Sequence, residues 1–127
     1  MATLIARPSF DFGLLEDISD VASAAGFSLP MALTQNLVER FIEPPEKLTH
    51  TFDARLRNLI RCLRMSVDTM GLFEKMNRGS IASPLFFTSV FRMAPKEFQE
   101  VTLKAVCGVD LLAKPVVVVM LPDGEQL

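Results

Sequence analysis

The sequence predicts an α+β fold in which about three helices pack on one face of a three-stranded antiparallel β-meander, in two layers. Helical periodicity fills residues 11–71, whereas three short runs rich in Phe or Val fill residues 85–122. Helices followed by strands are typical of this class. At 127 residues, of which 50% are hydrophobic and 22% charged, we expect one globular domain over 1–127, with a loop at 72–84 and a short C-terminal tail at 123–127.

The first helix is expected over residues 14–25, where apolar positions recur at helical spacing. Gly26 follows the last periodic residue and predicts a left-handed C-terminal cap, a conformation that costs glycine little. A second, shorter helix is expected after Thr34, whose hydroxyl can accept a hydrogen bond from the next turn. Pro44 and Pro45 are expected to end it.

The clearest element is a long helix over residues 51–70, which we expect to organise the core. Thr51 is its expected N-cap, Asp53 falls in its first turn and Gly71 follows its end. Its apolar positions keep helical spacing over five turns: Phe52, Leu56, Leu59, Ile60, Leu63, Val67 and Met70. After it, the segment 72–83 loses periodicity and collects loop-compatible residues, which predicts a mobile connection.

Three strands are then expected at 85–93, 101–107 and 116–121, joined by connections too short for helical crossovers. Alternation places Leu85, Phe87, Phe91 and Met93 on the face toward the helices. The opposite face carries apolar residues as well and must be covered. Either the loop at 72–83, a second subunit or a protein partner could cover it, so we take Phe86, Val90 and Val106 as the candidate partner surface.

Charge and hydropathy exclude several classes of protein. Thirteen basic against fifteen acidic residues give a net charge of -2, which offers no global field for nucleic acid or an anionic membrane. The longest apolar run, 116–121, is far shorter than the roughly 20 residues of a membrane helix. A charge and a proline interrupt the N-terminal segment before a secretory signal could form. We therefore expect a cytoplasmic protein without membrane association.

The residues that usually carry chemistry do not form a recognisable constellation. His50 is the single histidine and has no charged neighbour, while Cys62 and Cys107 lie too far apart in sequence for a CxxC-type metal site. Glycine-rich phosphate-binding motifs are absent from the sequence, and the kinase-like tripeptide 11–13 lacks the accompanying kinase motifs. We expect a protein that is not an enzyme and that needs no metal or cofactor.

The most suggestive polar feature is an arginine stripe on the long helix. Arg57, Arg61 and Arg64 occupy positions i, i+4 and i+7, which places them on one side of the helix. Such a stripe can contact phosphate groups, and it can equally be the solvated face of an amphipathic helix. The three arginines are therefore candidate phosphate contacts. Nucleic acid is a partner that they could bind, but the net charge of the chain does not favour it.

Two segments resemble a known family. The sequence AGFSLPMALT at 25–34, and VTLKAVCG at 101–108 followed by PVVVVMLP at 115–122, are similar to the domain of unknown function numbered 6573. Members of that family are small uncharacterised bacterial proteins. The resemblance covers most of the chain, but it departs at the N-terminus and around 72–83, and the chain has no tryptophan. It implies a common fold and a setting on plasmids, phages and other mobile elements, without catalytic residues to transfer.

These observations together predict a non-enzymatic interaction protein from a mobile genetic element. The family setting implies stoichiometric inhibition of a host defence complex, of the anti-CRISPR or antirestriction type. The alternative is a nucleic-acid-associated regulator that uses the arginine stripe. We expect a protein partner, and a second expectation is a homodimer in which another copy of the chain occupies the same surface.

Overall fold

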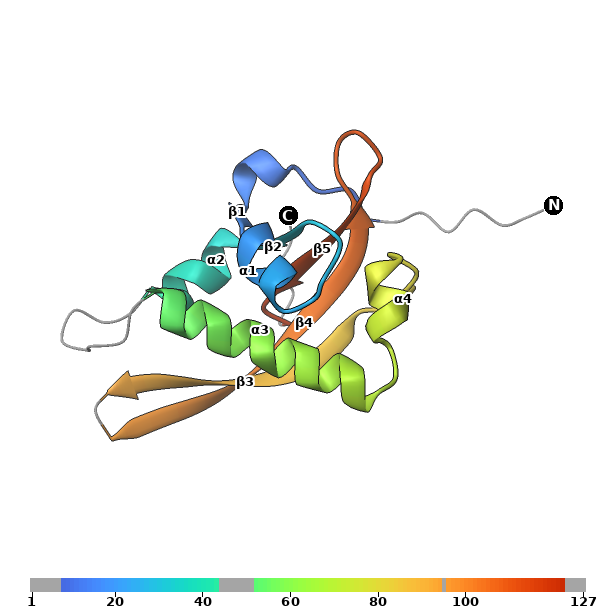
Figure 1. Ribbon diagram of the computed structural model, residues 1–127. Helices are drawn as coiled ribbons and strands as arrows, with labels where there is room; N and C mark the ends of the chain where they lie inside the picture. The colour runs from blue at the N-terminus through green and yellow to red at the C-terminus, as the bar shows by residue number, and fades with distance from the viewer. Residues whose placement is uncertain (1–7, 44–51, 95, 123–127) are drawn as a thin grey trace.

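The chain builds a five-stranded mixed sheet with helices on one face (Figure 1). The computed structural model describes residues 8–43, 52–94 and 96–122. Within them the strand order is β1-β2-β5-β4-β3. The elements are β1 (Glu16–Asp17), α1 (Ser19–Ala24), β2 (Met31–Leu33), α2 (Gln35–Leu37), α3 (Phe52–Thr69), α4 (Phe73–Asn77), β3 (Leu85–Ala94), β4 (Glu97–Val109) and β5 (Pro115–Met120).

The predicted antiparallel meander is present as β3, β4 and β5, but it is only part of the sheet. Strand β2 runs parallel to β5, with Met31 opposite Val117, and β1 runs antiparallel to β2. The expectation of three antiparallel strands, and of a wholly helical segment at 11–71, is therefore wrong. The run 31–33 is too short to show a period, and only its pairing with the buried strand β5 makes it a strand.

The helical expectations are confirmed at α2 and α3 and corrected at the first helix. Thr34 Oγ1 accepts a hydrogen bond of 3.4 Å from the Leu37 amide at the start of α2. Helix α1 begins only at Ser19, whose amide donates to the Asp17 carboxylate at 2.9 Å, so it is shorter than the helix expected over 14–25. A 3-10 helix and strand β1 replace the predicted first turns. Pro44, Pro45, His50 and Thr51 lie outside the described residues.

The segment 72–84, expected to be a mobile loop, contains the five-residue helix α4. The described residues therefore form four α-helices, where about three helices were expected. Met76 of α4 is buried in the main core. The Asn77 side chain donates to the Gly26 carbonyl at 3.2 Å and accepts from the Ser28 amide at 3.0 Å. Contacts between distant parts of the chain therefore hold this segment, which its own sequence pattern does not reveal.

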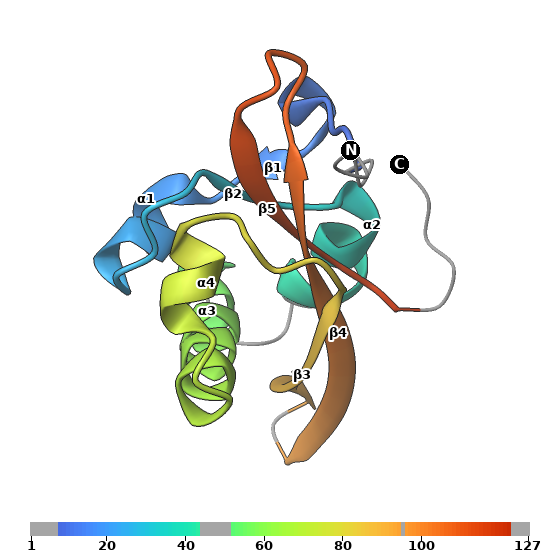
Figure 2. The same cartoon turned by 90° about the vertical axis from the view of Figure 1, so that its right-hand side faces the viewer.

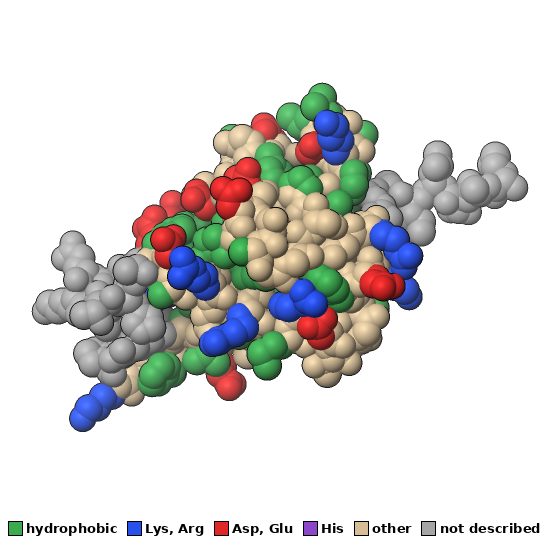
Figure 3. Space-filling view, viewed as in Figure 1, with side chains coloured by type: hydrophobic (Ala, Val, Ile, Leu, Met, Phe, Trp, Pro, Cys, Tyr) green, Lys and Arg blue, Asp and Glu red, His purple; other side chains and the backbone are tan. Residues whose placement is uncertain are grey.

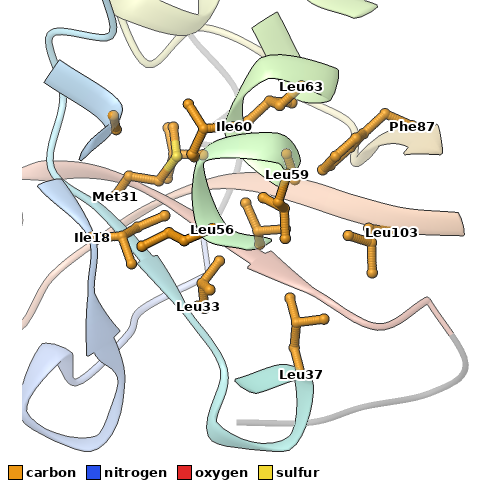
Figure 4. Packing of buried hydrophobic residues seen from close by; sticks show 14 of the residues in the cluster. Ile18, Met31, Leu33, Leu37, Leu56, Leu59, Ile60, Leu63, Phe87 and Leu103 are labelled. Carbon is orange, nitrogen blue, oxygen red and sulfur yellow. The ribbon is translucent and has the colours of Figure 1, made fainter. Parts of the chain in front are cut away.

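The main core lies between the helices and one face of the sheet (Figure 2). Helix α3 supplies a row of fully buried side chains that includes Leu59 and Leu63, as its periodicity predicts. They pack against side chains from α1, β2, α2, β3 and β4 (Figure 4). The residues labelled in that view are Ile18, Met31, Leu33, Leu37, Leu56, Leu59, Ile60, Leu63, Phe87 and Leu103.

A second, smaller core covers part of the other face of the sheet, so the two-layer expectation is incomplete. Residues 8–15, which we call the N-terminal strap, cross β4, where the Phe10 amide donates to the Val109 carbonyl at 2.8 Å and the Val109 amide donates to the Pro8 carbonyl at 2.9 Å. Apolar side chains of the strap cover apolar side chains of β4 and β5. This core comprises Phe10, Val106, Val116, Val118 and Met120, with Phe12 and Leu15 packed beside it.

Candidate interaction surfaces

The end of the β3–β4 hairpin projects as a two-stranded ribbon (Figure 1). Strand β5 pairs with β4 only over residues 104–109, whereas β3 pairs with β4 down to Glu97. Residues 97–103 of β4 therefore have a hydrogen-bonded neighbouring strand on one side only, which is β3. A two-stranded segment of this kind depends on packing against another element for its stability.

Helix α3 provides that packing on one face of the ribbon. Phe87, Phe91 and Leu103 are buried beneath it. The Asn58 side chain on α3 also donates a hydrogen bond of 2.9 Å to the Val90 carbonyl. The ribbon is thus attached to the helix layer through its inner face, which leaves the opposite face available for contact.

The outer face of the ribbon carries three exposed apolar side chains. The register pairs Val90 with Glu100 and Arg92 with Phe98, so Phe86, Val90 and Phe98 all point away from the helices. Their exposed fractions are 52%, 38% and 66%. We call this surface the outer face and define it by these three residues with Thr88, Glu100, Thr102 and Lys104.

The structure changes the membership of the predicted partner surface. Phe86 and Val90 are exposed as expected, but Val106 is only 9% exposed because the strap covers it through Phe10. Val106 is therefore not part of an exposed surface. Phe98 was missed because the second strand was expected to begin at residue 101, whereas β4 begins at Glu97. If the strand is extended from residue 101 back to residue 97, its alternation places Phe98 on the same face as Thr102.

The three arginines of the stripe line one groove between α1 and α3, with a volume of about 510 Å³. Its α3 side consists of residues at positions i, i+3, i+4, i+7 and i+8, which form a single helix face. Apolar side chains make its floor and arginines its rim. We call it the α1–α3 groove; its lining residues are Asp20, Val21, Ala24, Ala25, Arg57, Ile60, Arg61, Arg64 and Met65. Figure 3 shows basic side chains along α3 and acidic side chains gathered on the side of β1 and α2.

The three arginines differ in their contacts. Arg64 donates to the Ala25 carbonyl at 2.6 Å and to the Asp68 carboxylate at 2.9 Å, and its guanidinium carbon lies 3.5 Å from the centre of the Phe73 ring. Arg61 donates to the Asn58 side chain at 2.9 Å. The Arg57 side chain has no hydrogen bond or ion pair with another described residue, and both Arg57 and Arg61 are exposed. Two of the three charges thus face solvent at the rim.

A fourth arginine on the same helix has a structural role. Arg55 is buried, and its guanidinium donates a hydrogen bond of 2.6 Å to the Phe41 carbonyl. Burial lowers the pKa of this guanidinium from its ordinary value, because desolvation disfavours the charged form. Arg55 therefore joins α3 to the π-helix Val38–Ile42 that follows α2, and it does not contribute to the groove.

The described residues contain no group of three or more His, Cys, Asp or Glu side chains arranged to hold a metal ion. Among the helices in this part of the chain, none is long and apolar enough to cross a membrane. His50 lies outside the described residues. Comparisons of this chain with family models, with curated proteins and with solved structures find no match. Function must therefore be argued from the two surfaces themselves.

Proposed function

We propose that this protein acts by contact and binds a protein partner through the outer face of the β3–β4 ribbon. The observation that carries the proposal is the alignment of Phe86, Val90 and Phe98 on one exposed face of a projecting ribbon. Exposed apolar side chains that are scattered singly need no explanation, but a row of them on one rigid face is typical of an interaction site.

The chemistry of the outer face favours protein over nucleic acid. Two phenylalanines supply the large apolar side chains that anchor protein interfaces. Around them lie Thr88, Thr102, Glu100 and Lys104, and Arg92 occupies the register position opposite Phe98. Apolar anchors with charges of both signs around them are suited to a protein interface, whereas a phosphate backbone is bound mainly by clustered positive charge.

The proposed partner is a host defence complex that the protein inhibits stoichiometrically, by occupying a surface that the complex needs. This part of the proposal rests on the resemblance of the two sequence segments to small proteins of mobile elements. Binding by an apolar face requires no catalytic group, so it is compatible with the lack of a catalytic constellation in the sequence.

The proposal is tested by affinity capture with matched surface variants. Phe98→Asp should abolish capture of the partner, because a buried unpaired carboxylate is costly in an apolar interface. Leu111→Asp is the control: Leu111 is 69% exposed in the turn between β4 and β5, away from the outer face. Capture that survives Phe98→Asp and Phe86→Asp together would contradict the proposal.

A homodimer through the same face is distinguished by light scattering of the purified protein. If the wild-type protein is a dimer and Phe98→Asp is a monomer, the partner is a second copy of this chain. If both are monomers, the homodimer is excluded, and the capture experiment alone tests for another protein. The alternative of a nucleic-acid regulator depends on the arginine stripe and is tested together with the groove below.

A further inference from the structure

The α1–α3 groove is a second site, on the helix layer and thus on the opposite side of the sheet from the outer face. Its charge departs from that of the whole chain. Three arginines and one aspartate line it; since Asp68 neutralises Arg64, a local excess of one positive charge remains, whereas the chain has a net charge of -2. A local reversal of sign of this kind selects an anionic partner and increases its rate of association.

The floor of the groove is apolar. Val21 and Ala24 of α1 face Ile60 and Met65 of α3, and Met65 is 63% exposed. Exposed methionine adapts to different apolar partners because its side chain is unbranched and flexible. The ligand must therefore combine an apolar stripe with negative charges beside it.

The spacing of the available arginines defines that ligand further. Arg57 and Arg61 are four residues apart on α3, which corresponds to about 6 Å along the helix axis. Carboxylates four positions apart on an incoming helix have the same separation. A helix lying over α1 and α3 would place its apolar stripe on Met65 and its carboxylates against the two guanidinium groups.

We propose that the α1–α3 groove binds an acidic amphipathic helix of a partner protein. Nucleic acid fits the groove less well, because the floor is apolar and no aromatic side chain lines it for base stacking. A small molecule fits less well too, since the groove lies open along exposed residues, whereas small ligands are usually enclosed. The proposal does not depend on the outer face.

The test is a selection from a displayed library of random peptides of about 16 residues, or roughly 24 Å of helix. The wild-type protein should select sequences in which Leu, Ile or Met recur at helical spacing with Asp or Glu beside them. The double variant Arg57→Glu/Arg61→Glu should instead select Lys- and Arg-rich sequences. Selection of sequences without acidic residues, or the same sequences by both proteins, would overturn the proposal.

The best selected peptide is then synthesised and its affinity measured by fluorescence anisotropy. Arg57→Glu/Arg61→Glu should weaken binding by about tenfold or more, and Arg57→Ala/Arg61→Ala by a smaller factor in the same direction. Met65→Gln removes apolar contact at constant charge and should weaken binding by roughly threefold or more. Arg78→Glu is the control: Arg78 is exposed on the turn after α4, does not line the groove, and should leave the affinity within about twofold.

A single-stranded oligonucleotide provides the competing measurement. The proposal is overturned, and the groove is a nucleic-acid site, if the oligonucleotide binds more tightly than the peptide and shows three further properties. Its affinity must fall steeply with salt, fall with Arg57→Glu/Arg61→Glu, and stay unchanged with Met65→Gln. Thermal unfolding by circular dichroism confirms that each variant is folded. Because Arg57, Arg61 and Met65 are exposed, their substitution should leave the melting temperature close to that of the wild-type protein.

Discussion

The guanidinium carbon of Arg64 lies 3.5 Å from the centre of the Phe73 ring, so that the cation of α3 stacks on the first residue of α4. The same side chain donates to the Ala25 carbonyl, just beyond the end of α1, at 2.6 Å. One arginine therefore connects three helices and also lines the α1–α3 groove.

Arg64→Ala should lower the free energy of unfolding by about 1–3 kcal/mol, because it removes a charged hydrogen bond and a cation–π contact. Arg64→Lys should recover less than half of this loss, since an ammonium group cannot stack and form both hydrogen bonds in the same geometry. Urea denaturation measures both. Asp68→Asn is the control, because the ion pair is partly exposed and should contribute about 0–1 kcal/mol. A loss for Asp68→Asn equal to that for Arg64→Ala would show that the ion pair carries the effect.

Gly26→Ala should destabilise the protein by about 1–2 kcal/mol, because Gly26 has a φ of 95° that an L side chain rarely adopts. An added Cβ would also lie 2.6 Å from the Arg64 Nη1 atom. In the double variant Gly26→Ala/Arg64→Ala the clash is absent. Its loss of unfolding free energy should therefore be smaller than the sum of the losses of the two single variants. A double-mutant cycle by urea denaturation measures the coupling; strict additivity would exclude the clash.

Gly108→Ala should weaken the attachment of the N-terminal strap. A Cβ at this position would lie 2.5 Å from both Phe10 Cε2 and the Pro8 carbonyl oxygen, and the latter is backbone that cannot rotate away. We expect a loss of about 1–3 kcal/mol and faster hydrogen exchange at the Phe10 and Val109 amides. The Leu59 and Leu63 amides of α3 are the internal control. Unchanged exchange at Phe10 would show that the strap does not pass over Gly108 in solution.

Ser89→Ala should leave stability unchanged or raise it by up to about 1 kcal/mol. Ser89 is fully buried on the inner face of β3, and its hydroxyl has no hydrogen-bond partner among the described residues. Removing a buried hydroxyl that makes no hydrogen bond removes a desolvation cost. Thermal unfolding measures the change, with Thr88→Ala on the outer face as the matched control. A marked loss for Ser89→Ala alone would show that the hydroxyl is hydrogen-bonded.

The candidate surfaces were only partly predictable from the sequence. The alternation of β3 correctly places Phe86 and Val90 on the face away from the helices, because the side-chain period of a strand is a local property. The burial of Val106 under Phe10 was not predictable, since the two residues are nearly a hundred positions apart. The helical spacing of Arg57, Arg61 and Arg64 likewise predicts their shared side of α3, but the groove also needs α1 as its second wall.

Features that depend on neighbours along the chain were predictable from the amino-acid pattern alone. These are the apolar periodicity of α3, the Thr34 N-cap, the left-handed turn at Gly26 and the inward face of β3. Each follows from periodicity or from hydrogen bonds within a few residues, so the pattern is complete in a short window.

Three other features arise from contacts between distant segments: residues 31–33 form a strand, residues 73–77 form a helix, and the strap covers one end of the second sheet face. The physical reason is that these short segments have too few local hydrogen bonds to select a conformation alone. Their partners, which include Val117, Gly26 and Val109, come from distant parts of the chain, and burial against those partners supplies the stability that local propensity lacks.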